Sequence, residues 1–420
     1  MTTALTTTAT LNFGHEVPLA ARRVLALLQH LRVGVLTVTL PDASQHRFGA
    51  LHEDHAGSQV LHAQLQIQRW ALFGAVLKSG DIGLAESFIA GDWSTPDLVA
   101  LLHLLGANRQ ALESVVYGHW WGRLAYRLRH LLQRNSRAGS RKNIHAHYDL
   151  GNDFYKLWLD ETMNYSSAWF DGNPDLPMPL AQTAKVRRAL DEAGVKSGSR
   201  VLEIGCGWGA LAEQACLHYG AQVVGVTLST EQLAWGQARL QKLGIDTGAG
   251  ARADLRLQDY RDIGDAPFDA ICSIEMVEAV GQAYWPQYFQ TVRRLLKPGG
   301  RACIQSIVIR DDLFDRYVRS TDFIQQYIFP GGCLPSCAAF RAQAQAAGLR
   351  VGTELAFGRD YAHTLHQWRA AFHARRAEVL AQGFDERFCR IWDFYLAYCE
   401  AAFLSGDIDV VQFTLHHDAL

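Results

Sequence analysis

The alternation of strand-like and helix-like segments after residue 195 constrains the fold of this 420-residue chain more than any other feature. Short apolar runs are separated by stretches with helical spacing, which is the pattern of parallel strands joined by crossover helices. The sequence therefore predicts an α/β fold, with a parallel sheet covered by helices on both faces. Strands are expected near 200–205, 222–227, 253–258, 268–274 and 301–309, and candidate strands at 350–357 and 410–416 would complete a seven-stranded sheet.

The segment "VLEIGCGWGAL" (201–211) is an apolar strand that runs into closely spaced glycines before a helix begins. Glycines at this point let the backbone approach a bound ligand. The spacing Gly205-x-Gly207-x-x-Ala210 also matches the dinucleotide-binding fingerprint. Two features favour S-adenosylmethionine over NAD. Glu203 suits the ammonium group of the former, and "GVTLST" stands where NAD binding requires an acid about 20 residues later.

Two further segments follow the same order of elements. "RLQDYRD" (256–262) places Asp259 and Tyr260 after the third strand, where contacts with adenine are expected, and "VRRLLKPGGRACIQS" (292–306) reads as a helix, a turn and a strand. Over about 195–310 this succession resembles the class I S-adenosylmethionine-dependent methyltransferases, which have a Rossmann-like fold.

A narrower resemblance covers about 145–415. The blocks "NIHAHYDLGNDFYKLWLDETMNYSSAWF", "GVTLSTEQLAWGQARL", "LQDYRDI", "EMVEAVG" and "FGRDYAHTLHQW" look together, and in this order, like the cyclopropane-fatty-acyl-phospholipid synthase family. "GDIGLAESFIAGDWSTPDLVALL" (80–102) looks like the small N-terminal domain of the longer, phospholipid-acting members. The resemblance implies methyl transfer from S-adenosylmethionine to the double bond of an unsaturated acyl chain in phospholipid.

The resemblance also implies how the methyl donor is bound. A tyrosine–serine pair closes over the donor in this family, and a short segment after the second strand contacts its adenosine. Together with the glycine segment, the matching donor-binding residues are Tyr165, Ser166, Glu203, Gly205, Cys206, Gly207, Gly209, Thr227, Leu228, Ser229, Gln232, Asp259 and Tyr260.

Attack by the alkene leaves a carbocation on the acyl chain, and the faces of aromatic rings can stabilise it in a dry pocket. A base must then remove a proton. In the family the base is thought to be a bicarbonate ion held in a small cage of side chains. The candidate aromatic residues are Tyr165, Trp169, Phe170, Phe329 and Tyr361.

The resemblance assigns the cage glutamate to Glu278 and the cage tyrosine to Tyr361. Ser167 stands at the position of the cage cysteine and Gln305 at that of the cage histidine. Glutamine cannot be protonated, so the second departure weakens the expectation that bicarbonate binds. Cys399 matches a cysteine that has been proposed to be reactive and completes the candidate catalytic residues.

The stretch "SIEMVEAVG" (273–281) contains a second glutamate, Glu275, to which the resemblance assigns no role. A carboxylate in an apolar run needs a partner or a function. We expect Glu275 to lie at a partly exposed helix start.

Loss of the proton from the new methyl group would close a cyclopropane ring, which is the family's usual product. The departures at Ser167 and Gln305 favour a second outcome, methyl transfer without ring closure, which gives a methyl-branched or methyl-diene chain. The sequence also allows methyl transfer to a small soluble amine or phenol, a non-catalytic protein that binds lipid and S-adenosylmethionine, and NAD-dependent redox chemistry.

The sequence predicts four regions: a disordered tail (1–15), a small α+β lipid-associated N-terminal domain (16–112), a basic-aromatic linker helix (113–142) and the methyltransferase domain (143–420). Residues 114–148 contain no Asp or Glu, and Trp120 and Trp121 precede a run of arginines. This composition is typical of a helix on an anionic membrane surface, and also of a solvated interdomain helix.

Composition excludes several classes of protein. A net charge of −2 gives no field that would attract nucleic acid. The cysteines show no CxxC pair, which suits a reducing cytoplasm, and no run reaches the length of a membrane span. His145 and His147 have no Cys or His partner at ligand spacing, so no metal is expected. We expect a cytoplasmic protein, peripheral at the inner membrane surface. The resemblance is also compatible with a homodimer.

Overall fold

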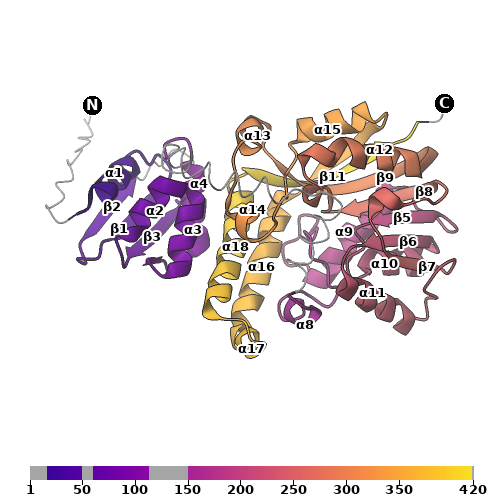
Figure 1. Cartoon of the computed structure of the whole chain (residues 1–420), viewed down its shortest axis with the longest axis horizontal. Coiled ribbons are helices and arrows are strands. Elements are labelled where there is room, and N and C mark those ends of the chain that lie inside the picture. Colours follow the sequence, from indigo (N-terminus) through magenta and orange to yellow (C-terminus); the bar gives the residue numbers. More distant parts are fainter. Residues whose placement is uncertain (1–16, 50–59, 113–149, 419–420) are drawn as a thin grey trace. The chain divides into compact units, whose positions relative to one another are not determined.

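The computed structural model describes residues 17–49, 60–112 and 150–418 (Figure 1). They belong to two compact units, one within residues 1–125 and one within residues 126–420. The predicted tail (1–15) and linker helix (113–142) lie outside the described residues.

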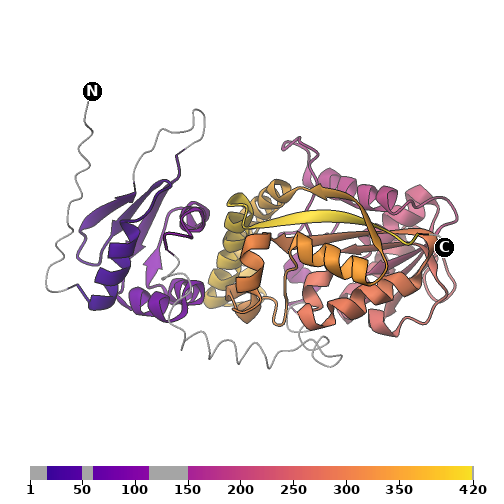
Figure 2. The same cartoon turned by 90° about the horizontal axis from the view of Figure 1, so that it is seen from above.

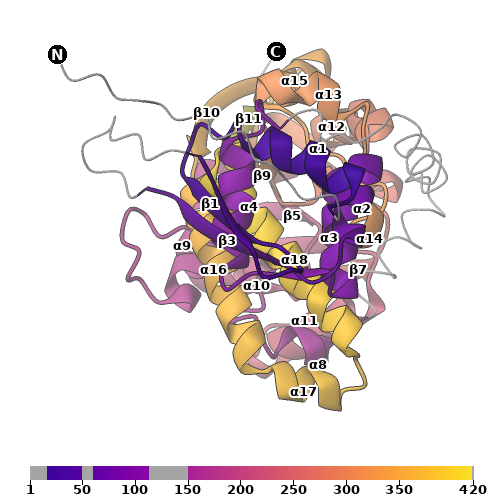
Figure 3. The ribbon, with the colours of Figure 1, turned by 90° about the vertical axis from the view of Figure 1, so that its left-hand side faces the viewer.

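The N-terminal unit is a small α+β domain. Its sheet has the order β2-β1-β3-β4, formed by β1 (Val35–Thr39), β2 (Gln45–Gly49), β3 (His62–Ile67) and β4 (Trp93–Ser94). Its helices are α1 (Leu19–Leu28), α2 (Ala71–Ser79), α3 (Asp81–Ala90) and α4 (Leu98–Ala107), and α4 packs on β1 and β3 (Figure 3). The patterns predicted α1, β1, β3 and α4. Gly83 lets α3 approach α2, because a Cβ there would meet the Ala75 carbonyl oxygen at 2.1 Å.

The C-terminal unit is built on a seven-stranded sheet with the order β10-β11-β9-β8-β5-β6-β7. All seven predicted strands are confirmed, and the sheet appears in Figure 2 with β11 in yellow. The strands are β5 (Arg200–Ile204), β6 (Gln222–Thr227), β7 (Ala253–Leu257), β8 (Phe268–Ile274), β9 (Leu296–Ile309), β10 (Arg350–Ala356) and β11 (Ile408–His416).

The expectation of a wholly parallel sheet is wrong at one edge, because β11 runs antiparallel to both β9 and β10. The preceding helix, α18 (Glu386–Leu404), ends shortly before β11, and Ile408 at the start of β11 pairs with Ile309 at the end of β9. The chain therefore enters at the end where β9 finishes and can only run back along it. Strand periodicity carries no information about this direction.

Helices cover both faces of the sheet, as predicted. On one face, α9 (Met178–Glu192), α10 (Ala210–Tyr219) and α11 (Thr230–Lys242) contribute Leu190, Leu211 and Leu240 to an apolar core. On the other face, α12 (Trp285–Leu295) and α15 (Cys337–Ala346) contribute Phe289 and Phe340. The sheet is therefore buried on both sides, which is usual for parallel strands.

The remaining helical segments are α8 (Asn152–Tyr155), α13 (Asp311–Tyr317), α14 (Phe323–Tyr327), α16 (Gly358–Ala374) and α17 (Arg376–Ala381), with short 3₁₀ turns η1 (Tyr260–Asp262), η2 (Val277–Ala279) and η3 (Gln282–Tyr284). Aromatic rings join the α8-containing segment, which runs from α8 to residue 170, to α16 and α18. The Trp158 and Trp368 rings lie 5.6 Å apart, and those of Phe154 and Trp392 lie 5.0 Å apart.

Candidate functional site

A pocket lies where the central parallel strands end, and it encloses about 1200 Å³ of space, part of it open to solvent. The loop from β5 to α10 forms part of its wall. Gly205 has φ +87°, and a Cβ at this position would meet the Met276 side chain at 3.0 Å. Glycine is therefore required at Gly205 both by the backbone conformation and by the neighbouring side chain. Gly207 and Cys206 also line the pocket, whereas Gly209 directly precedes α10 and has φ +82°.

Glu203 lies in this pocket, and one of its carboxylate oxygens, Oε2, is buried without a hydrogen-bond partner among the described residues. Burial raises the pKa of Glu203, and the positive charge of Lys185 opposes the shift. A buried carboxylate with a free oxygen is costly unless a cationic or donor group meets it. The ammonium group of an amino-acid ligand has the required charge.

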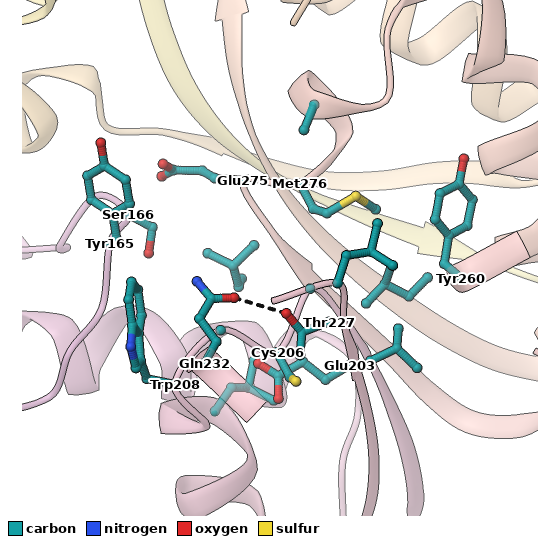
Figure 4. A pocket seen from close by; sticks show the side chains of 18 of the residues that line it. Tyr165, Ser166, Glu203, Cys206, Trp208, Thr227, Gln232, Tyr260, Glu275 and Met276 are labelled. Carbon is teal, nitrogen blue, oxygen red and sulfur yellow. Dashed lines mark hydrogen bonds between the residues drawn. The ribbon is translucent and has the colours of Figure 1, made fainter. Parts of the chain in front are cut away.

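The segment after β6 forms another part of the wall. The Thr227 hydroxyl donates to the Gln232 amide oxygen (2.9 Å), and both residues line the pocket together with Leu228 (Figure 4). The Ser229 side chain instead accepts from the Gln232 backbone N–H and caps α11. Ser229 therefore positions the segment, and the other three face the ligand space.

Asp259 and Tyr260 line the pocket after β7. The Asp259 carboxylate forms an ion pair with Arg261 (2.5 Å) and accepts from the Arg261 backbone N–H (3.0 Å). These contacts fix the turn η1.

Tyr165 and Ser166 bring the α8-containing segment to the pocket (Figure 4). The hydroxyls of Tyr165 and Tyr395 are 2.7 Å apart, which ties this segment to α18. The Ser166 hydroxyl accepts a 2.5 Å hydrogen bond from Lys185, whose side chain is fully buried on α9. Burial lowers the pKa of Lys185 to about 8, although Glu275, Asp160 and Glu203 favour its charged form.

The expectation for Glu275 is confirmed in one respect and wrong in another. The residue is partly exposed, but it does not begin a helix: it follows β8 directly, lines the pocket, and points its carboxylate toward Tyr165 and Ser166 (Figure 4). That carboxylate accepts from the Ser167 backbone N–H (2.9 Å), Gln305 Nε2 (2.7 Å) and the Tyr361 hydroxyl (2.7 Å). Three of the four expected cage residues thus surround a carboxylate that belongs to the chain itself.

Burial and these contacts act on the pKa of Glu275 in opposite directions. Burial raises its pKa, while Lys185, Tyr361, Ser167 and Gln305 favour the ionised form. Glu275 has φ +51°, a left-handed conformation that is uncommon for a residue with a side chain. Its backbone N–H donates to the Gln305 carbonyl oxygen (2.8 Å), which holds the turn in place.

Glu278, the expected cage glutamate, accepts a short hydrogen bond from the Ile307 backbone N–H, and its buried Oε2 has no hydrogen-bond partner within the described part of the chain. Burial and the nearby charge of Glu275 raise the pKa of Glu278 to about 8. The protonated form of Glu278 is therefore favoured more strongly than that of an ordinary glutamate. The pair resembles sites in which two carboxylates are given different protonation states by their environment.

The remaining expected residues lie in varied surroundings. Burial and Asp322 raise the pKa of Cys399, so the structure does not favour a reactive thiolate there. Of the aromatic candidates, Tyr165 and Tyr361 lie near the Glu275 carboxylate. Phe170 packs on the His363 ring, Phe329 on the Tyr395 ring, and Trp169 under the Arg188 guanidinium.

Sequence reasoning missed Glu275 and Lys185. The signal for Lys185 is visible in the sequence: Gln182 and Lys185 are spaced i, i+3 and share one face of α9 with Ala181 and Ala189, all buried. Polar residues on an apolar helix face need partners, and here Gln182 donates to the Ser166 carbonyl oxygen (2.9 Å).

Among the described residues, no group of three or more His, Cys, Asp or Glu side chains could hold a metal ion. The described helices include none that is long and apolar enough to cross a membrane.

Residues 135–413 match the family model described as mycolic acid cyclopropane synthetase. Tuberculostearic acid methyltransferase UfaA1 of Mycobacterium tuberculosis is 41% identical over 352 residues, covering 82% of this chain and 81% of that protein. Cyclopropane-fatty-acyl-phospholipid synthase of Escherichia coli K12 is 34% identical over 379 residues, covering 89% and 94%. The structure of mycolic acid cyclopropane synthase CmaA1 with SAH and CTAB matches with a TM-score of 0.60 and 33% identity, covering 66% of this chain and 97% of that one.

Proposed function

The chain belongs to the mycolic acid cyclopropane synthetase family, and from this we propose that it methylates the double bond of an unsaturated acyl chain in phospholipid. It is an S-adenosylmethionine-dependent methyltransferase with the class I fold. NAD-dependent redox chemistry is therefore set aside. Within this class, Glu275 is the proton acceptor, and the product is a methylated alkene without a ring.

One observation carries the proposal: the Glu275 carboxylate accepts hydrogen bonds from Ser167, Gln305 and Tyr361. These residues stand at positions where the family is thought to hold bicarbonate. Because their donors already hold the Glu275 carboxylate, this chain has no need of a separate anion. A carboxylate within reach of the reacting carbon can act as a general base.

S-adenosylmethionine supplies an electrophilic methyl group when it is bound. The free oxygen of Glu203 would hold its ammonium group, and Thr227, Gln232 and Tyr260 would line the space for its nucleoside. Tyr165 and Ser166 cover the site from the α8-containing segment. An alkene is a weak nucleophile, so much of the rate enhancement comes from holding the two reactants in line.

The proton balance follows from the alkene. The π electrons form the new carbon–carbon bond as the bond between the methyl carbon and sulfur breaks, with its electron pair left on sulfur. The neighbouring alkene carbon becomes cationic, facing the rings of Tyr165 and Tyr361. Glu275 takes a proton from a carbon beside the cation, and the C–H electrons form a new double bond. The product is a methyl-substituted chain with one double bond. A saturated branch would require an additional reductant, so this chain alone does not make it.

Tethering of the base favours this outcome over ring closure. A free anion can shift with the transferred methyl group, whereas the Glu275 carboxylate is fixed by its backbone and by three hydrogen bonds. It reaches only protons that pass directly in front of it. The name of the relative that is 41% identical, a methyltransferase rather than a cyclopropane synthase, points the same way. Cyclopropane formation, the function in the name of the E. coli relative, is the second candidate.

The lipid substrate also implies contact with a membrane. We propose that the basic-aromatic segment 114–142 meets anionic lipid headgroups and that the protein works as a peripheral membrane protein. The composition of the segment supports this, since arginines and tryptophans together favour an anionic interface.

The test is mass spectrometry of lipids after the pure protein has been incubated with methyl-deuterated S-adenosylmethionine and unsaturated phospholipid vesicles. Mild catalytic hydrogenation of the product separates the candidates, because it adds two hydrogens to a methylated alkene and leaves a cyclopropane ring unchanged. We expect the labelled product to take up hydrogen. A labelled product that resists hydrogenation would establish ring closure, and the absence of labelled lipid would favour a small soluble acceptor or a non-catalytic protein.

A further inference from the structure

Three hydrogen-bonded side chains, those of Gln305, Gln412 and Arg188, form a line that leads away from the pocket. Gln305 on β9 and Gln412 on β11 are direct neighbours in the sheet, and both are buried. Gln412 Nε2 donates to Gln305 Oε1 (3.0 Å) and to the Lys185 carbonyl oxygen (3.2 Å). Gln412 Oε1 accepts from Arg188 of α9 (2.5 Å).

Arg188 fixes the direction of every bond in this line. A guanidinium has only donors, so the Gln412 atom that faces it must be the oxygen. The Gln412 nitrogen then faces Gln305, whose oxygen must accept. The Gln305 nitrogen is left to point at the Glu275 carboxylate, which can only accept when ionised.

The reversed arrangement is unfavourable at each step. A turned Gln412 amide would set its nitrogen against the guanidinium and its oxygen against the Lys185 carbonyl. A turned Gln305 amide would set its oxygen against the Glu275 carboxylate. Buried polar groups left without partners are costly, so the line has a single satisfied orientation.

We propose that Gln412 and Arg188 are positioning residues, which hold the Gln305 amide so that it donates to Glu275 and keeps that carboxylate ionised. This inference rests on the proposed function, in which the ionised form of Glu275 is the base. It also explains how a glutamine can serve in the cage: its orientation is fixed by the line, and it needs no charge of its own.

The line is held in place at its far end. Arg188 NH2 lies 3.3 Å from Glu192, one turn further along α9, and the guanidinium lies over the Trp169 ring at 5.8 Å. Glu192 in turn accepts from the Thr353 and Thr414 hydroxyls, both at 2.7 Å. The guanidinium therefore has little freedom to turn away from Gln412.

Gln412→Leu tests the proposal, because it removes the donor to Gln305 without changing the net charge. We expect the pKa of Glu275 to rise by about one unit, since a hydrogen bond that favours the ionised form is lost. Infrared spectroscopy of the protonated carboxyl group, assigned by its loss in Glu275→Gln, measures this pKa directly. The acidic limb of the kcat–pH profile should shift by the same amount, while KM for S-adenosylmethionine stays within about twofold.

Arg187→Met is the matched control, because Arg187 is the exposed neighbour on the same helix and its guanidinium donates to Gln214 (3.1 Å) rather than to Gln412. It should leave the infrared pKa unchanged. If Gln412→Leu fails to fold, Arg188→Met gives a second test, with a shift in the same direction. An unchanged Glu275 pKa in a folded variant overturns the positioning role.

The two proposals can fail separately. Full activity of Glu275→Gln would remove Glu275 as the base, and the infrared titration would still decide whether Gln412 controls its ionisation. Loss of activity in Glu275→Gln without any infrared shift in Gln412→Leu would keep the base and reject the positioning line.

Discussion

Glu275 combines a strained backbone with a carboxylate that is held by three hydrogen bonds. Its left-handed conformation, with φ +51°, costs on the order of 1 kcal/mol or more for a residue with a Cβ. Residues in such conformations persist where their surroundings hold them, and they gather at functional sites. Here the Gln305 carbonyl holds the Glu275 N–H, and three donors hold its carboxylate.

Glu275→Gln should lower kcat by roughly 100-fold or more, because the amide cannot accept the proton. Binding of S-adenosylmethionine should change little, since the substitution preserves the size of the side chain. Assays with labelled S-adenosylmethionine measure kcat, and calorimetric titration measures the affinity for S-adenosylmethionine. Full turnover by the folded variant would exclude Glu275 as the base.

Lys185 gives the stability of the protein a defined pH dependence. Its pKa is about 8 in the folded chain, lowered by burial from 10.5. Between these values only the unfolded chain holds the proton. Because the unfolded state binds more protons at this lysine, the contribution of Lys185 to the free energy of unfolding rises with pH, by up to about 1.4 kcal/mol per unit. Buried thiols such as that of Cys399, whose pKa is raised by burial, contribute in the opposite direction.

Lys185→Met should remove this contribution, so that the free energy of unfolding rises less, or falls more, with pH than in the wild type, whereas Lys156→Met, at an exposed lysine, should keep the wild-type slope. Urea denaturation at several pH values between 8 and 10.5 measures the slope. Equal slopes for the wild type and Lys185→Met would contradict the lowered pKa of this buried lysine.

The resemblance placed Ser167, Gln305 and Tyr361 near one another, and the structure brings them around one carboxylate. It did not place Glu275 there. The sequence "SIEMVEAVG" carries two glutamates three residues apart. This spacing fits several turn geometries, so it does not show which of the two side chains points into the pocket. Only the positive φ at Glu275, which no residue pattern reveals, directs its side chain into the pocket.

At the scale of elements, the strands were predictable because each is an apolar run bounded by turn residues. The direction of β11 was not, since it depends on where α18 delivers the chain. This antiparallel pairing has a consequence for the site. It sets Gln412 directly beside Gln305, so a strand whose direction was predicted wrongly provides the neighbour of a cage residue.

Two glycines that flank β5 offer a matched pair of substitutions: Gly205 directly follows the strand, and Gly198 lies two residues before it. Gly205 and Gly198 have similar φ values, +87° and +80°, but a Cβ would meet Met276 at the first and no described atom within 4 Å at the second. Alanine should cost each variant about 1–2 kcal/mol of stability through backbone strain, and Gly205→Ala should cost more because its Cβ also meets Met276. Only Gly205→Ala should weaken S-adenosylmethionine binding, by about tenfold or more. Equal affinities of the two variants for S-adenosylmethionine in calorimetric titration would contradict the role of Gly205 in binding the methyl donor.

At the scale of the whole molecule, access to the lipid is proposed to depend on the basic-aromatic segment. Replacing Arg123, Arg127, Arg129 and Arg134 by Gln should lower binding to anionic vesicles, by about 1 kcal/mol for each charge near the surface. The difference in binding between the variant and the wild type should shrink at high salt, because screening already weakens the binding of the wild type to anionic vesicles. Sedimentation with anionic and neutral vesicles measures it, and equal binding to both by the wild type would reject the electrostatic contact.

The most direct test of the tethered base is the dependence of turnover on bicarbonate. In carbonate-free buffer, the wild-type protein should keep its full rate on phospholipid vesicles, because Glu275 accepts the proton. Glu275→Gly should lose turnover and regain part of it when bicarbonate or formate is added, since Ser167, Gln305 and Tyr361 would then surround an open anion site. A wild-type rate that falls on removal of bicarbonate and returns when it is restored would contradict the account.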